Sequence, residues 1–194
     1  MEKLTRDFYN RDTVTVARDL LGNYLVRVLD GETLVCRITE TEAYVGRCDK
    51  ACHAYGYKRT ARTETLFAKP GTAYIYLIYG MYNCLNFVTE PEGEPAAVLI
   101  RGLEAVSGAK TLARLRYQKP LAELTPYQQR NFLNGPGKLC KALSLDRSYD
   151  GTDLTGDTLY VVCSGETPEQ IHVGLRVGID YAEEAVYFPW RFWI

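Results

Sequence analysis

Residues 72–88 read Thr-Ala-Tyr-Ile-Tyr-Leu-Ile-Tyr-Gly-Met-Tyr-Asn-Cys-Leu-Asn-Phe-Val, a stretch rich in tyrosine and in strand-forming residues. Strand-forming side chains flank Gly80 on both sides, which is typical of a β-hairpin with a short turn. The tip would carry Tyr79 and Met81, two large apolar side chains that an exposed turn seldom presents. The pattern therefore predicts a tyrosine-rich hairpin whose tip is either covered by another element or inserted into a ligand.

The chain before this hairpin predicts a short helix and two further strand regions. Cap residues at positions 10–13 precede apolar residues at helical spacing, and Gly22 closes the element. Residues 24–28 and 33–42 are extended runs separated by Asp30-Gly31-Glu32, which is a hairpin signal. Residues 97–100 form another short apolar strand after the tyrosine-rich hairpin.

The rest of the chain alternates helical and extended patterns. Residues 108–118 have helical periodicity, and the loop Asn134-Gly135-Pro136-Gly137 opens a second helix at residues 138–143. Residues 159–163 and 173–179 suit strands, and no repeat or linker interrupts the pattern. We therefore expect one α+β domain over residues 1–194, with a predominantly antiparallel curved β-sheet, a protruding β-hairpin and peripheral helices.

The composition is that of a globular protein. The chain has 194 residues, of which 46% are hydrophobic and 24% charged, and this excludes a largely disordered chain. The six cysteines are scattered, and residues 1–11 contain no apolar run typical of a signal peptide. No apolar stretch reaches the roughly 18 residues that a membrane span needs. The sequence therefore predicts a reduced, cytoplasmic protein without a membrane partner.

The net charge of −1 gives no overall reason to expect a polyanion, but the charges are unevenly distributed. Residues 101–141 hold eight basic and two acidic residues, and residues 47–70 hold six basic and two acidic ones. If folding gathers these two stretches, one face of the molecule can bind phosphates. The alternative is that each stretch is simply a solvated surface.

Two carboxylates follow the apolar positions of the strand at residues 33–42. Leu34, Cys36 and Ile38 share one face by the period of two, and the same period places Glu40 and Glu42 on that face. Their spacing of roughly 6.6 Å along a strand would suit an acid and base pair around a water molecule. Such a strand would deliver both carboxylates to the floor or rim of a pocket, whereas a strand that ends earlier would leave both solvated.

Other side chains offer weaker signals for chemistry. The cluster Cys48-x-x-x-Cys52-His53 could ligate zinc, but no second pair at ligand spacing follows, so we expect no metal site. The glycine motifs of nucleotide-binding proteins and serine hydrolases are absent. Tyrosines are interleaved with basic residues between positions 44 and 82, a mixture that suits a nucleic acid because tyrosine stacks on bases while lysine and arginine hold phosphates.

Several of these segments together resemble the alkyladenine (3-methylpurine) DNA glycosylase family. The motifs occur in order from about residue 5 to residue 192, and they are Glu40-Thr41-Glu42-Ala43-Tyr44, Asp49-x-x-x-His53, Lys69-Pro70-Gly71-Thr72-x-Tyr74-x-Tyr76-x-x-Tyr79-Gly80-Met81-Tyr82, Asn86, Val98-Leu99-Ile100-Arg101 and Asn134-Gly135-Pro136-Gly137-Lys138-Leu139. The resemblance implies a single mixed α/β domain and a monofunctional enzyme of base excision repair.

The resemblance assigns catalytic roles that the chemistry supports. Hydrolysis of an N-glycosidic bond passes through a cationic sugar, so the enzyme needs a water molecule at C1′ and a base to deprotonate it. Glu42 matches the general base of the family, and Arg101 and the backbone carbonyl of Val177 match the groups that hold the water with it. The resemblance gives Glu40 no catalytic role. It implies no cofactor, no metal and no active-site lysine, and the product is an abasic site.

The resemblance also assigns residues that bind the damaged base. Tyr79 matches the residue that intercalates into DNA when the target base leaves the stack. Tyr44, His53 and Tyr76 match the sandwich around the flipped purine, where a cationic purine gains cation–π attraction. Asn86 matches the residue that excludes the 2-amino group of guanine.

The implied partner is double-stranded DNA that contains damaged purines: 3-methyladenine, 7-methylguanine, hypoxanthine and ethenoadenine. Four residues match positions that face the DNA backbone, and these are Arg62, Met81 through its main chain, Arg116 and Lys138. We expect a monomer that is cytoplasmic and nucleoid-associated in a bacterium or nuclear in a eukaryote. Two alternatives are a nucleic-acid-binding module without catalysis and a zinc-stabilised interaction domain.

Overall fold

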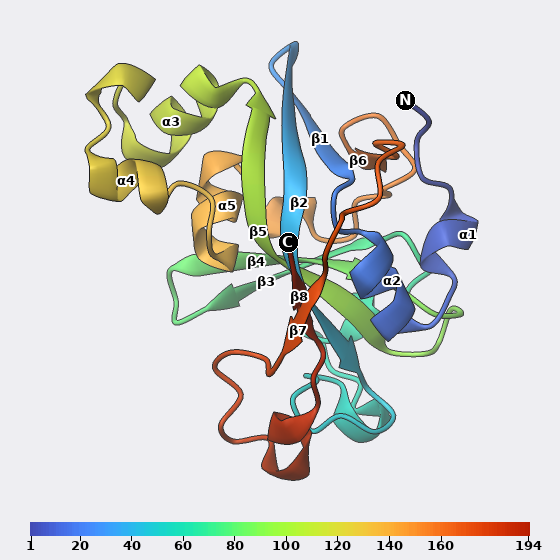
Figure 1. Ribbon diagram of the computed structural model, residues 1–194. Coiled ribbons are helices and arrows are strands. Elements are labelled where there is room, and N and C mark those ends of the chain that lie inside the picture. Colours follow the sequence, from blue (N-terminus) through green and yellow to red (C-terminus); the bar gives the residue numbers. More distant parts are fainter.

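The computed structural model describes all 194 residues, which form one α+β unit around an antiparallel sheet (Figure 1). The eight strands are β1 (Tyr24–Leu29), β2 (Glu32–Val45), β3 (Ala73–Ile78), β4 (Tyr82–Val88), β5 (Ala96–Ser107), β6 (Leu159–Val162), β7 (His172–Gly174) and β8 (Arg191–Trp193). The five α-helices are α1 (Arg6–Tyr9), α2 (Thr13–Asp19), α3 (Ala109–Tyr117), α4 (Pro126–Arg130) and α5 (Pro136–Ala142). This architecture confirms the expected fold class.

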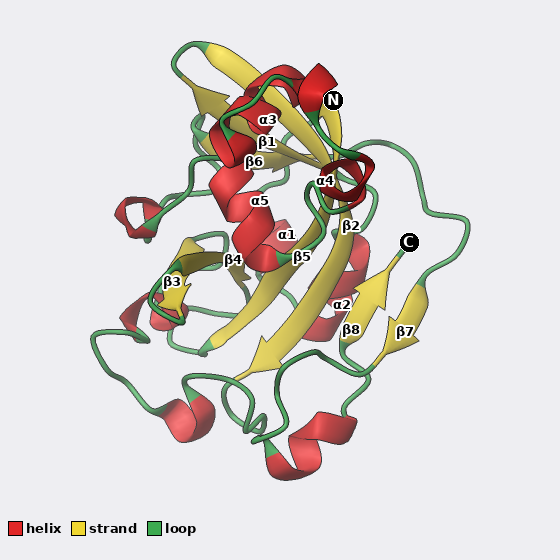
Figure 2. Cartoon of the chain, turned by 90° about the vertical axis from the view of Figure 1, so that its left-hand side faces the viewer, coloured by secondary structure: helices red, strands yellow, loops and turns green.

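The strands follow the order β3-β4-β5-β2-β1-β6, and every pair is antiparallel. The long strand β2 pairs with β5 along one edge, and on its other edge it pairs first with β1 and then with β8. Strand β7 extends this second part through β8. Figure 2 shows β2 and β5 crossing the molecule side by side, with β7 and β8 next to β2. Strand β2 therefore connects the two halves of the sheet.

The expected helix and hairpin near the N-terminus are confirmed. Asp12 caps α2, because its carboxylate accepts a hydrogen bond of 2.8 Å from the Thr15 N–H. Gly22 has a φ of 84°, a left-handed conformation that ends the helical segment. The β1–β2 turn places Asp30 and Gly31 at positive φ, as the Asp-Gly pair predicts.

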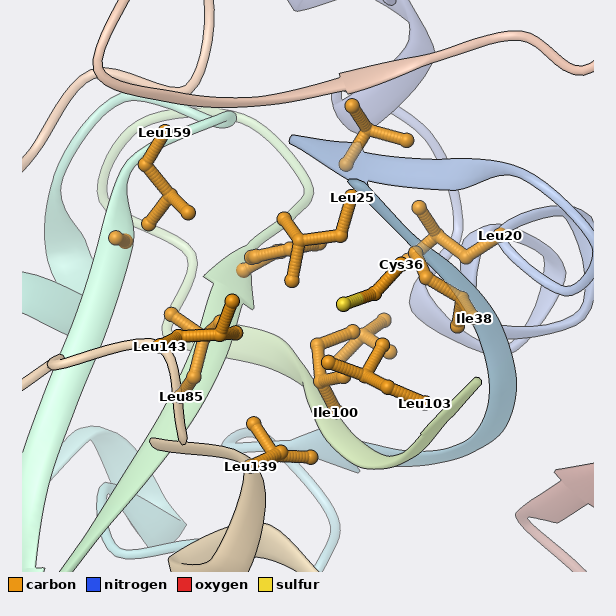
Figure 3. Close-up of a cluster of buried hydrophobic side chains, with 14 of the residues drawn as sticks. Leu20, Leu25, Cys36, Ile38, Leu85, Ile100, Leu103, Leu139, Leu143 and Leu159 are labelled. Atoms are coloured by element: carbon orange, nitrogen blue, oxygen red, sulfur yellow. The ribbon is translucent and has the colours of Figure 1, made fainter. Parts of the chain in front are cut away.

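One hydrophobic cluster of 28 buried residues joins these elements. Figure 3 shows its centre, where Leu25 and Ile38 from the first hairpin lie near Leu85, Ile100 and Leu139. In Figure 1, α2 lies on the right of the sheet, while α3, α4 and α5 lie on the left. The helices thus cover a curved sheet that leaves the β3–β4 hairpin projecting from it.

Strand β2 departs from a strict period of two. Its pairing with β5 changes register on both sides of Glu40, where the strand is irregular. Beyond this point Ala43, rather than Glu42, joins the hydrophobic cluster that contains Leu34, Cys36 and Ile38. The simple alternation from Leu34 to Glu42 is therefore wrong, because an irregularity at residues 39–41 intervenes.

Two further expectations are wrong, and the four-residue helix α1 was not predicted. Strand β5 continues to Ser107 instead of ending near Ile100. The apolar run at residues 173–179 is a strand only as far as Gly174, and the remainder is a loop. No helix is both long and apolar enough to cross a membrane.

Candidate active site

A cavity of about 430 Å³ opens beside the β3–β4 hairpin. Strands β3, β4 and β5 form the floor of the cavity, and two loops, at residues 51–53 and 177–181, form its walls. Seven of the site residues expected from the sequence line this cavity, and these are Tyr44, His53, Tyr76, Tyr79, Asn86, Arg101 and Val177. Residues that lie far apart in the sequence are therefore brought together here.

Glu42 lies directly behind the floor of the cavity. One carboxylate oxygen, Oε2, accepts a hydrogen bond of 2.7 Å from the Tyr44 hydroxyl. The other, Oε1, accepts one of 2.8 Å from the Val177 N–H and lies 3.4 Å from Nε of Arg101. Each carboxylate oxygen can accept a second hydrogen bond, so the carboxylate retains capacity for a further donor such as water.

Burial controls the acidity of Glu42, whose side chain has no exposed surface. Burial raises the pKa of Glu42 above its ordinary value, whereas Arg101, the Tyr44 hydroxyl and the Val177 N–H oppose this increase. Because three partners stabilise the negative charge inside a desolvated site, the carboxylate is held in one orientation. This is the environment in which a carboxylate becomes a stronger base than it is in water.

Glu40 belongs to the same charged network but has different partners. Its Oε1 accepts hydrogen bonds from Nε of Arg101 at 3.0 Å and from Nε of Arg191 at 2.6 Å. The two carboxylates of the Glu40/Glu42 pair therefore share Arg101 and do not face each other across an open gap. An acid and base pair with a water molecule between them, the interpretation from spacing, does not fit this arrangement.

Aromatic rings form one wall of the cavity. His53 contacts Tyr76 edge to face with ring centroids 4.5 Å apart, and Tyr74 lies 5.4 Å from Tyr76. Nδ1 of His53 lies 3.1 Å from the Tyr74 hydroxyl, and Nε2 faces the Arg62 guanidinium at 3.4 Å. Burial, together with Arg62, lowers the pKa of His53 from 6.5 to about 4, so this side chain is neutral at pH 7.

Asn86 lies on β4 beside this wall and is buried. Its amide nitrogen donates hydrogen bonds to the carbonyls of Tyr74 at 3.1 Å and Cys84 at 3.2 Å. Both amide hydrogens are thus used by the main chain, and the side-chain oxygen remains free on the residue that lines the cavity. The position of Asn86 is fixed by the hairpin itself.

The hairpin tip lies at the mouth of the cavity. Tyr79 is 80% exposed and Met81 is 66% exposed, so no other element covers them. The turn closes with a hydrogen bond of 3.2 Å from the Met81 N–H to the Ile78 carbonyl, and Tyr79 adopts a φ of 53°. A tyrosine in the left-handed region is strained, which is a feature that clusters at functional sites. The main chain of Met81 is expected to contact the DNA backbone, and its N–H is already used within the turn.

The three basic residues expected to face the DNA backbone lie in two separate places. Arg62 lies 5.3 Å over the Tyr76 ring, at the edge of the aromatic wall. Arg116 and Lys138 line a separate groove near Tyr82, where Arg116 donates to the Phe132 carbonyl and Lys138 to the side chains of Asn131 and Asn134. Helix α5 reaches the hairpin here, because a Cβ on Gly137 would lie 2.9 Å from Tyr82.

Sequence reasoning missed a fully buried ion pair behind the cavity. Arg176 and Asp49 form two contacts, of 2.5 Å and 2.8 Å, and neither side chain is exposed. It also missed that the Val177 N–H donates to Glu42, because the resemblance implied a role only for the Val177 carbonyl. Asp49 stood in a recognisable motif, but nothing in the sequence linked it with a residue 127 positions away.

The structure offers no cluster of ligands for the zinc ion of a zinc-stabilised domain. Cys48 is exposed, Cys52 is buried, and both ring nitrogens of His53 face other side chains. The structure contains no group of three or more histidine, cysteine, aspartate or glutamate side chains that could hold a metal ion.

Comparison with known proteins identifies the family to which the chain belongs. A family model described as Methylpurine-DNA glycosylase (MPG) matches residues 7–194. The chain therefore belongs to this family of DNA glycosylases, which are hydrolases. It is 52% identical over 195 residues to a protein of Clostridium perfringens (strain SM101 / Type A), a match that covers 99% of this chain and 95% of the relative.

Two further bacterial relatives are similar over nearly their full length. One, from Alkaliphilus oremlandii (strain OhILAs), is 50% identical over 192 residues, covering 99% of this chain and 95% of its own length. Another, from Desulfitobacterium hafniense (strain Y51), is 49% identical over 194 residues, covering 100% of this chain and 96% of its own length. All three relatives carry the name "Putative 3-methyladenine DNA glycosylase".

Proposed function

We propose that this chain is a monofunctional 3-methyladenine DNA glycosylase. It flips a damaged purine out of duplex DNA into the aromatic cavity and hydrolyses the N-glycosidic bond with a water molecule activated by Glu42. The observation that carries this proposal is the buried Glu42 carboxylate, which Arg101, Tyr44 and Val177 hold directly behind the cavity floor. The names of the three relatives support the same substrate.

The proposed mechanism uses Glu42 twice. As a base it takes a proton from the attacking water, and as an anion it stabilises the positive charge that develops on the sugar. Arg101 and the Val177 main chain hold the water beside it. Both roles gain strength from burial, since charge interactions are stronger where water is excluded. The product is an abasic site.

The cavity also fits a preference for cationic purines. Tyr44, Tyr74 and Tyr76 offer ring faces that attract a positively charged base, and the neutral His53 adds no repulsion. A methylated cationic purine leaves without needing a proton. Hypoxanthine needs one, and Glu40 is held by two arginines, so we propose faster release of 3-methyladenine and 7-methylguanine than of hypoxanthine or ethenoadenine.

A monofunctional reaction fits the residues around the cavity. No lysine lines it, so no amine is placed to attack the sugar and form a Schiff base. The exposed Tyr79 at the mouth is placed to fill the gap that the flipped base leaves, and Arg62, Met81, Arg116 and Lys138 are proposed to contact the DNA backbone. We propose that the enzyme acts as a monomer without a cofactor.

The test is single-turnover release of 3-methyladenine and hypoxanthine from labelled duplex DNA in EDTA, at saturating enzyme. Glu42→Gln keeps the shape of the side chain but removes the base, so its rate should fall by about 10³-fold while DNA affinity stays unchanged. The exposed Glu104 on β5 provides a matched control, and Glu104→Gln should keep the wild-type rate. No release by the wild type, with DNA still bound, would instead indicate a binding module without catalysis.

A further inference from the structure

The Asp49–Arg176 ion pair joins three segments around the cavity. The Arg176 guanidinium forms two contacts with Asp49, donates 2.8 Å to the Ala43 carbonyl on β2, and donates 3.1 Å to the Ala185 carbonyl in the 3-10 helix Glu183–Tyr187. Asp49 also accepts hydrogen bonds from the N–H groups of Val45 and Ala51. The pair thus ties β2 to two loops.

Two residues of this network lie next to residues of the proposed mechanism. Ala43 directly follows Glu42, and Arg176 directly precedes Val177, whose N–H donates 2.8 Å to Glu42. Asp49 lies in the loop that carries His53 into the aromatic wall. One guanidinium therefore links the strand that supplies the carboxylate to the loop that supplies its hydrogen-bond donor.

Buried side chains hold the loop at residues 175–179 at two points: Arg176, and Ile179, which packs against Ala51, Ala182 and Ala185. Strand β7 ends at Gly174, and the side chains on either side of Arg176 are about half exposed, 52% for Leu175 and 48% for Val177. Arg176 is the buried residue between them, and its ring contacts are Tyr44 at 4.7 Å and Trp190 at 5.2 Å. The position of the Val177 N–H therefore depends on where Arg176 is held.

Stability alone does not account for this pair. Burying two charges costs desolvation that their attraction only partly offsets, so a buried ion pair is weak evidence of a stabilising role. Nε of Arg176 is also buried without a hydrogen-bond partner, which adds to the cost. Positioning of a functional group gives a reason for an arrangement that is costly to bury.

We propose that Asp49 and Arg176 are positioning residues that hold the Val177 N–H against the Glu42 carboxylate. The proposal rests on the function proposed above for Glu42. If the pair is broken, Val177 moves away and Glu42 loses a hydrogen bond that favours its charged form. The rate should then fall, and it should fall most at low pH, because a larger fraction of Glu42 is protonated.

Charged and titratable groups face Glu42 from several other elements. Arg101 on β5, Glu40 and Tyr44 on β2, Cys84 on β4 and Arg176 in the loop all lie near the carboxylate. Among them, Arg176 contacts Asp49 directly, and the Tyr44 ring contacts the Arg176 guanidinium at 4.7 Å. The substitution Asp49→Asn should therefore act on Glu42 through Arg176 and its neighbours, while Arg101 and Glu40 keep their contact with each other.

The experiment compares Asp49→Asn and Arg176→Lys with the wild type. Both variants should fold and bind duplex DNA like the wild type, but their saturating single-turnover rates at pH 7 should fall by about 10- to 100-fold. With an N-methylated purine, whose departure needs no proton, the acid limb of the pH profile should move up by about one pH unit. Arg176→Lys keeps a positive charge opposite Asp49, so it remains informative if Asp49→Asn does not fold.

Amide hydrogen exchange of Val177 in ¹⁵N-labelled protein gives a readout that is independent of activity. Exchange should become faster in both variants, because the N–H no longer faces the carboxylate. Glu90→Gln is the matched control: Glu90 is also a buried carboxylate paired with an arginine, Arg47, but it does not touch the cavity. This control should change neither the pH profile nor the exchange of Val177.

Two results separate this inference from the proposed function. A protected Val177 N–H or an unmoved acid limb in folded Asp49→Asn would overturn the positioning role while leaving Glu42 as the base. A wild-type rate in Glu42→Gln would overturn the role of Glu42 as the base, and the exchange of Val177 would still decide whether the ion pair holds this N–H in place.

Discussion

The floor of the cavity and the tip of the β3–β4 hairpin are built in opposite ways. Behind the floor, Glu42 and the Asp49–Arg176 pair are fully buried, and nearly every polar atom there has a partner. At the tip, Tyr79 and Met81 are mostly exposed, and only a turn holds them. The side chains behind the floor are held in place by their own hydrogen bonds, whereas the tip exposes apolar surface to the solvent.

This difference suits the two tasks that we propose for these regions. A base that must deprotonate a water molecule at a defined carbon gains from being held rigidly in a desolvated site. A wedge that must enter a base stack gains from being exposed and large. The comparison implies that substitutions at the floor change the rate of the chemical step, and that substitutions at the tip change capture of the base.

Tyr79→Ala should give the largest effect at the tip. Loss of an aromatic ring that stacks in DNA costs about 2 kcal/mol, so affinity for duplex DNA with a flipped base should fall by about 30-fold. The saturating single-turnover rate should change much less, because the floor is intact. Titration of binding alongside single-turnover release measures both quantities. Unchanged affinity and an unchanged rate would contradict the wedge role.

Tyr79→Phe provides the matched control for this prediction. It keeps the ring and removes only the hydroxyl, so its affinity should stay near that of the wild type. A loss as large as that of Tyr79→Ala would show that the hydroxyl, and not stacking, matters at the tip.

Glu40→Gln should give a smaller effect at the floor. Arg101 would lose the charge of its nearer partner, at 3.0 Å, and would interact more strongly with Glu42. The pKa of Glu42 should then decrease, since Glu40 contributes to raising it. A weaker base lowers the plateau rate by about 3- to 10-fold and moves the acid limb to lower pH. A limb that moves to higher pH, as expected for Asp49→Asn, would show that Glu40 supports the charge of Glu42 instead.

Much of the fold was predictable from the sequence because local rules govern it. The capped helix, the Asp-Gly turn and the tyrosine-rich hairpin each depend on residues within a few positions of one another. The irregularity of β2 at residues 39–41 was not predictable, since it depends on how β5 pairs across it. The residues at 175–179 are largely apolar, as in a strand, but β7 ends at Gly174. Arg176 then pairs with Asp49 in the interior, so this segment forms a loop.

The same distinction applies to the candidate site. Family motifs predicted which residues meet, and the seven that line the cavity do meet. Which atoms contact which could not be predicted, because the Val177 N–H faces Glu42 only after a loop distant in sequence has folded against β2. The family motifs therefore identify the residues of the wall and the tip, while the contacts behind the floor depend on long-range packing.

The smallest expected effect concerns His53, which lies in the aromatic wall of the cavity. Its pKa is lowered from 6.5 to about 4 by burial and by Arg62, so the unfolded chain binds more protons than the folded one between these values. Stability should therefore decrease as the pH falls from about 6.5 to about 4, by at most about 3 kcal/mol from this residue. Urea unfolding at pH 7 and pH 5 should show a smaller loss for His53→Gln than for the wild type. An equal loss in both proteins would mean that His53 is solvated in the folded state, which would place it with the exposed tip instead of the buried wall.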